Sequence, residues 1–107
     1  MKDAIVTLEV IAVFQNDQQV GITARIARAA EEAPGAWVCQ VELAPVYNEP
    51  MNVKGVDSFH ATWLACSLVL RLLAQLKKEG AALRSLDGTE FPVDAYLGGL
   101  GGDAAGG

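Results

Sequence analysis

The feature that most constrains this fold is a long apolar segment, residues 57–80, bounded by a helix-start and a helix-stop signal. Asp57 or Ser58 can accept a hydrogen bond from the free N–H groups of a first helical turn. Gly80 can take the left-handed conformation that ends a helix, and the basic residues at 77–78 suit the negative end of the helix dipole. The segment is therefore predicted to form one helix.

The apolar surface of this helix is wider than one sheet can cover. At about 100° per residue, the polar positions form one narrow stripe: His60, Ser67, Arg71, Gln75 and Lys78. A helix lying on a sheet needs an apolar arc of roughly 100°, and this one has about twice that. We therefore expect a second covering surface, with four interface candidates on the helix: Trp63, Leu64, Leu68 and Leu72.

Alternating segments before the helix predict β-strands. Residues 3–15, 19–29 and 36–44 place apolar side chains at every second position, and Asn16 and Asp17 favour a hairpin turn between the first two strands. Residues 31–35, which contain Pro34 and Gly35, are predicted to be a loop. Residues 47–53 are a weaker candidate for a fourth strand.

After the helix, a short C-terminal hairpin is predicted. Residues 82–86 and 91–93 flank the turn signal Asp87-Gly88, and residues 94–97 can begin another helical turn. Residues 98–107 contain mostly glycine and are expected to be a flexible tail. The order of elements predicts a single α+β domain over residues 1–97, in which an antiparallel meander of three or four strands packs on one long helix in two layers.

Composition narrows the class of partner and the compartment. The net charge of −5, with no basic cluster, argues against nucleic acid and against an anionic membrane surface. The N-terminus lacks the pattern of a signal peptide, and Arg71 and Gln75 interrupt the helix too early for a membrane span. A cytoplasmic location is expected.

Few residues suggest chemistry. Cys39 and Cys66 are expected to be small buried side chains. These two cysteines and the one histidine, His60, do not supply the close ligand pairs expected of a zinc site. No catalytic residues are assigned, and no cofactor or metal is expected. An enzymatic function is less favoured than a non-enzymatic one. The aromatic residues near the third strand and the helix start are expected to cluster: Phe14, Trp37, Tyr47, Phe59 and Trp63. That cluster is interpreted either as ordinary core or as an exposed patch around Trp63.

The residues that begin the helix support a resemblance. The pattern Gly55-Val56-Asp57-Ser58, followed by an apolar helix and an Asp-Gly hairpin, resembles a family of small uncharacterised bacterial proteins over residues 38–93. The resemblance implies a strand meander before a "GVDS" helix start, and it implies no reaction. The family's aromatic-and-glycine strand after the helix is replaced in this chain by residues 82–86.

Two hypotheses of function follow. The first is a non-enzymatic interaction module that forms a homodimer or binds a protein partner through the apolar helix. The second is a small-molecule-binding or hydrolytic domain with a pocket near the helix N-terminus. The candidate ligand-binding residues of that pocket are Tyr47, Glu49, Asp57, His60 and Trp63. Whether these side chains converge or point separately into solvent distinguishes the two hypotheses.

Overall fold

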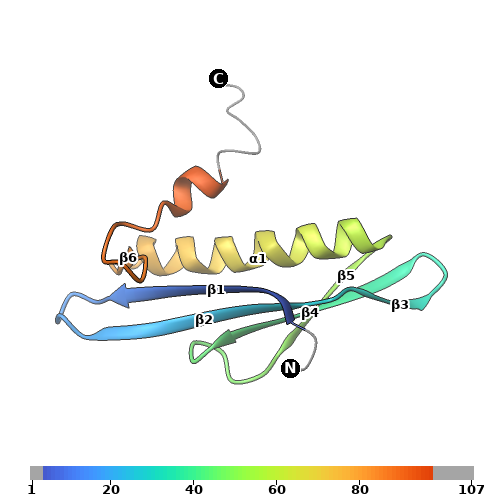
Figure 1. Cartoon of the computed structure of the whole chain (residues 1–107), viewed down its shortest axis with the longest axis horizontal. Coiled ribbons are helices and arrows are strands. Elements are labelled where there is room, and N and C mark those ends of the chain that lie inside the picture. The colour runs from blue at the N-terminus through green and yellow to red at the C-terminus, as the bar shows by residue number, and fades with distance from the viewer. Residues whose placement is uncertain (1–3, 98–107) are drawn as a thin grey trace.

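A curled antiparallel sheet and one long helix form the two layers of the protein, as the sequence predicts (Figure 1). The computed structural model describes residues 4–97. The strands are β1 (Ala4–Val13), β2 (Gln19–Ala27), β3 (Ala30–Ala33), β4 (Ala36–Ala44), β5 (Met51–Gly55) and β6 (Ala82–Arg84), and the helix is α1 (Ser58–Lys78). The α+β class is confirmed.

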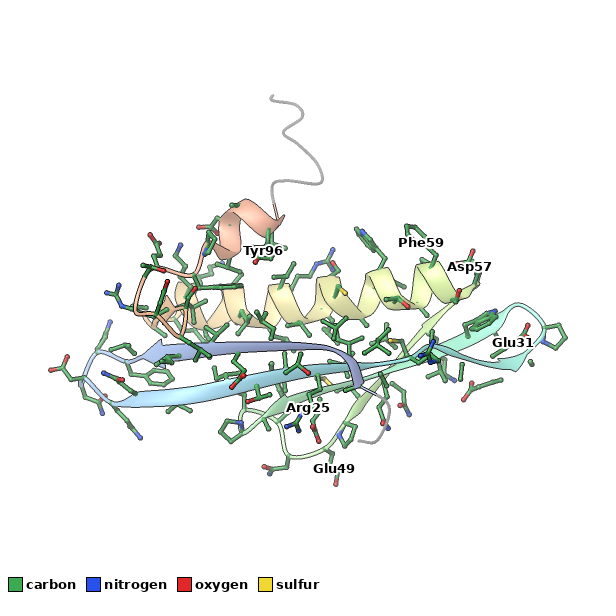
Figure 2. The ribbon with its side chains drawn as sticks, viewed as in Figure 1. Arg25, Glu31, Glu49, Asp57, Phe59 and Tyr96 are labelled. Atoms are coloured by element: carbon green, nitrogen blue, oxygen red, sulfur yellow. The ribbon has the colours of Figure 1, made fainter. Side chains whose placement is uncertain are left out.

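The central strands follow the predicted alternation. β1 pairs with β2, with Val10 opposite Ile22 and Ala12 opposite Val20. β2 pairs with β4, with Ala24 opposite Leu43. Side chains at these positions face α1 and are buried or, at Val20, partly buried. Arg25 lies on the opposite, solvent-facing side (Figure 2), where it pairs with Glu42. The period of two in the sequence is therefore the period of the buried face.

Two strand predictions are wrong in position. The predicted loop at 31–35 is a hairpin, because β3 pairs with the start of β4 and only Pro34 and Gly35 form the turn. Every residue of β3 is exposed, so no burial pattern marked it as a strand. The fourth strand begins at Met51 rather than at 47. Residues 45–50 form a turn instead, in which Tyr47 N–H donates to Leu43 O at 2.9 Å.

The helix ends agree with the predicted signals. Asp57 is the N-cap residue, and its Oδ1 accepts from His60 N–H at 2.7 Å. At the other end Gly80 has φ +111°, and Gly80 N–H and Ala81 N–H donate to Lys77 O and Leu76 O. These two bonds form a Schellman ending, which satisfies carbonyl groups that the last turn leaves without partners.

One stripe of α1 forms its contact with the core. Ala61, Ala65, Val69 and Leu73 recur at every fourth position and are buried, and α1 packs chiefly against β4 and β5 and also contacts β2 and β6. Small residues in the first half bring the helix close to the sheet, and Gly55 lets β5 approach the first turn. α1 has the length and hydropathy of a membrane-crossing helix, a property that core helices of folded domains share.

The C-terminal segment folds back over the end of α1. β6 pairs with β1, and an isolated bridge between Arg84 and Glu90 completes a short hairpin around Gly88. Residues 93–97 then form a short helix that lies above α1 (Figure 1). Phe91 and Val93 are buried, and therefore this segment belongs to the core. The predicted tail at 98–107 lies outside the described residues.

Candidate functional site

The start of α1 holds two of the predicted ligand-binding residues in a capping arrangement. Asp57 accepts from His60 N–H, and His60 Nδ1 in turn accepts from Val56 N–H at 3.1 Å. Because Nδ1 acts as an acceptor, this bond requires the neutral imidazole with its proton on Nε2. Both side chains therefore cap the N-terminal end of α1 through hydrogen bonds to backbone N–H groups.

A shallow hollow of about 410 Å³ adjoins this helix start. Its walls are Val56, Asp57, Phe59, His60 and Trp63. Phe59 is 78% exposed and Trp63 is 41% exposed, so the apolar walls stand in solvent. The hollow brings Asp57, His60 and Trp63 together as expected.

The other two predicted residues lie elsewhere. Tyr47 follows the last residues of β4, whereas the helix start follows β5 at Gly55, which pairs with Trp37 near the beginning of β4. The two places are therefore separated by about 20 Å of strand, from roughly 3.3 Å per residue. Figure 2 shows Glu49 on the far side of the sheet from Asp57. The predicted pocket between the 47–52 segment and the helix start is not formed.

The predicted aromatic cluster is also wrong. Phe14 lines a hollow beside Gly80, at the opposite end of α1 from Phe59. Trp37 packs against the core, whereas Phe59 projects into solvent. The sequence places these residues near strand ends but does not say which end of each strand is adjacent to the helix start.

The interface candidates fall into two groups. Leu72 packs against the core, so part of its surface is already used by the fold. Leu64 and Leu68 are half-buried but do not pack against the core cluster. Phe59 and Trp63 are exposed on the other flank of α1, across the polar positions Ser67 and Arg71. We call the four apolar residues on these two flanks, Phe59, Trp63, Leu64 and Leu68, the outer helix face.

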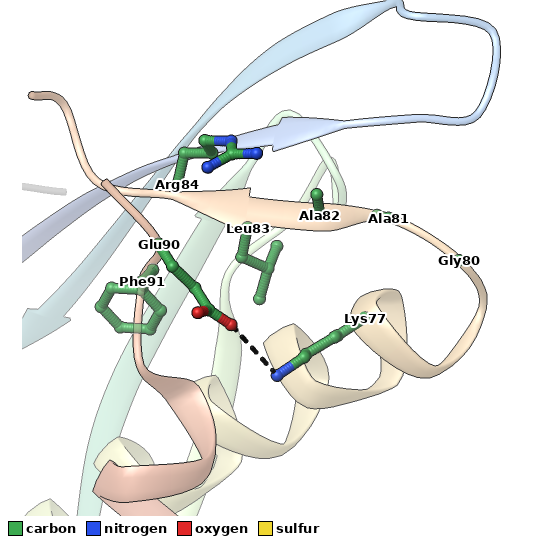
Figure 3. Close-up of a pocket in the computed structure, with 8 residues that line it drawn as sticks. All are labelled: Lys77, Gly80, Ala81, Ala82, Leu83, Arg84, Glu90 and Phe91. Carbon is green, nitrogen blue, oxygen red and sulfur yellow. Dashed lines mark ion pairs between the residues drawn. The ribbon is translucent and has the colours of Figure 1, made fainter. Parts of the chain in front are cut away.

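A second hollow, of about 390 Å³, lies where α1 meets the C-terminal hairpin (Figure 3). Lys77 Nζ reaches Glu90 Oε2 at 3.7 Å across it and Asp94 Oδ2 at 2.8 Å. The hydrogen bond to Asp94, and then its charge and that of Glu90, raise the pKa of Lys77. These ion pairs hold the C-terminal segment against α1, so we interpret this hollow as part of the packing between the two segments and not as a binding site.

The two cysteines lie near each other between β4 and α1. Cys39 Sγ donates to Ala27 O at 3.2 Å, and both thiols are free. Burial raises the pKa of both thiols, and the neighbouring Cys66 raises that of Cys39 further. Neutral thiols are poor nucleophiles and poor metal ligands. Within residues 4–97 no three His, Cys, Asp or Glu side chains gather as a metal site.

Two further hollows were not anticipated from the sequence. They lie beside α1 and share Cys66, Leu70 and Tyr96 as walls. Tyr96 is brought there by the short helix at 93–97, whose position depends on tertiary contacts. Comparison of the chain with protein-family models, curated proteins and solved structures finds no match, so the resemblance over residues 38–93 stays a prediction.

Proposed function

We propose that the protein is a non-enzymatic interaction module that forms a homodimer through the outer helix face. The observation that carries this proposal is the surface of Phe59, Trp63, Leu64 and Leu68, which is exposed or half-exposed and lies outside the core packing. Four large apolar side chains left outside the core on one helix indicate a contact site, since large exposed apolar areas are uncommon on monomers. Aromatic residues supply much of the energy of such contacts.

A second copy of the chain suits this surface for an electrostatic reason. The sequence from Ser58 to Lys78 contains no Asp or Glu, and its basic residues are confined to positions 71–78. An antiparallel two-fold pairing would place Leu64 against the partner's Leu68, and it would hold the two basic helix ends far apart. A parallel pairing would bring those like charges together, at a cost in stability.

The hydrolytic alternative has less support. Asp57 and His60 are hydrogen-bonded to backbone groups of the helix start, and Tyr47 and Glu49 lie elsewhere. A general base needs a substrate proton within hydrogen-bond reach and a group that orients the base. Within residues 4–97 these side chains supply no such set.

Light scattering on a size-exclusion column tests the proposal. Leu68→Glu should shift the mass from dimer toward monomer, because it places a charge in the apolar contact. Leu86→Glu is the matched control, since Leu86 is 64% exposed on the C-terminal hairpin, away from the outer helix face. A wild-type monomer at every concentration, or equal masses for the two variants, would contradict the proposal.

A further inference from the structure

Two adjoining hollows form a continuous apolar slot between α1, β1 and the C-terminal short helix. The outer hollow, of about 370 Å³, is lined by Trp63, Cys66, Ser67, Leu70, Arg71, Tyr96 and Leu97. The inner hollow, of about 270 Å³, reaches between β1 and α1 to core residues. Cys66, Leu70 and Tyr96 form walls of both. Ligand pockets generally measure about 300–1,000 Å³ and are mostly apolar with a few polar groups.

The inner end of the slot is apolar and reaches deep into the fold. Ala24, Ile26 and Val69 lie at its base and are buried, and Val6 at its rim is 40% exposed. Thr7 and Tyr96 carry the two hydroxyl groups in that lining, and none of its side chains is charged. Burial raises the pKa of the Cys66 thiol further above neutral pH, so this wall carries no charge. This end suits a hydrocarbon chain.

The wall formed by Tyr96, which is 49% exposed, is anchored to the core on one face. Its ring stacks on that of Phe91, with centroids 5.1 Å apart and planes inclined by 27°. Phe91 is only 3% exposed, and Asp94 in the same turn pairs with Lys77 of α1. The slot is therefore bounded by an anchored side chain, as expected of a pre-formed site.

The outer end carries one charge, the guanidinium of Arg71. Among the ion pairs formed within residues 4–97, none involves Arg71. No carboxylate occurs on α1 itself, although the whole chain has a net charge of −5. A cation at the mouth of an apolar slot complements a ligand with an anionic head, because guanidinium groups bind carboxylate and phosphate oxygens in pairs.

From this combination we infer that the slot binds a free single-chain anionic amphiphile, with its chain beside Cys66 and Leu70 and its acidic head at Arg71. A long-chain carboxylate is the simplest member of this class. The inference does not rest on the proposed dimer, because all of the lining residues belong to one subunit. Trp63 is the one residue that the slot shares with the outer helix face, and Leu68 is not in the slot.

Isothermal titration calorimetry with dodecanoate, kept below its micellar concentration, tests this inference. We expect saturable binding with one ligand per chain and weaker binding of dodecyltrimethylammonium, which has the same chain and the opposite charge. Arg71→Gln should weaken dodecanoate binding by about fivefold, the size of one partly exposed ion pair. Lys54→Gln is the control, because Lys54 lies on β5, away from the slot, and should leave binding unchanged.

A second pair of variants separates the slot from general adsorption. Cys66→Phe adds bulk where the two hollows meet and should abolish binding, whereas Cys66→Ala keeps the space and should retain it. Circular dichroism establishes that each variant is folded, and Tyr96→Ala removes the anchored wall if Cys66→Phe fails to fold. The inference is overturned if dodecanoate shows no saturation, if the two head groups bind equally, or if both Cys66→Phe and Tyr96→Ala bind like wild type. Binding to phosphatidylglycerol vesicles without binding of free dodecanoate would also overturn it.

Discussion

Gly55→Ala should destabilise the fold strongly, because β5 touches the first turn of α1 at this residue. A Cβ atom on Gly55 would lie 2.5 Å from Ala61 N, 2.8 Å from Ala61 Cα and 3.0 Å from His60 C. All three neighbours are backbone atoms, so no side chain can rotate away. Overpacking in a core typically costs about 1–3 kcal/mol, and we expect the upper part of that range here.

Urea denaturation followed by circular dichroism measures this effect, with Gly21→Ala as the matched control. Gly21 also lies in a strand, and a Cβ there would meet nothing within 4 Å. The control should be neutral or stabilised by up to about 1 kcal/mol through a less flexible unfolded chain. For a domain of this size, about 2 kcal/mol corresponds to a loss of roughly 8–16 °C in Tm. Equal unfolding midpoints for the two variants would refute the close approach of β5 and α1.

Three further perturbations test the core and the helix start. Leu73→Ala should reduce the free energy of unfolding by about 2–5 kcal/mol, because Leu73 is 1% exposed in the buried stripe, and an unchanged urea midpoint would contradict that placement. Asp57→Ala should cost about 1 kcal/mol by removing the acceptor for His60 N–H, while Asp57→Asn, which keeps an acceptor oxygen, should cost less in the same assay. Burial raises the pKa of Cys39 and Cys66 above the ordinary 9.0, so the unfolded thiols ionise first and stability should fall as pH rises beyond that value. Urea midpoints from pH 8 to about 10.5 should fall less steeply in Cys66→Ala than in wild type, and parallel slopes would refute the assignment.

The elements that the sequence predicts well are those with strong local signals. Asp57 and Gly80 bound the helix because capping depends on side-chain and backbone chemistry within a few residues. β1, β2 and β4 alternate because one face of each is buried. β3 has no buried face, and it is a strand because it pairs with β4. The sequence therefore carries no burial pattern from which β3 could be predicted.

The candidate site was predicted less well because it depends on long-range placement. Asp57 and His60 were identified correctly as neighbours, but their hydrogen bonds to the backbone give them a role in the helix start. Tyr47 is ten residues before Asp57 in the sequence, yet β5 carries the chain back along β4 and separates the two positions. The slot beside Cys66 depends on the fold-back of Tyr96: the sequence predicts the helical turn at 94–97, but not the tertiary contacts that place it against α1.

The mass of the protein in solution, measured by light scattering over a hundredfold range of concentration, tests the proposed self-association most directly. We expect wild type and Leu86→Glu to approach twice 11.3 kDa at the highest concentration and Leu68→Glu to remain near 11.3 kDa. Circular dichroism should show that all three are folded, since Leu68 does not pack against the core. A wild-type mass of 11.3 kDa throughout the range would contradict a homodimer built on the outer helix face.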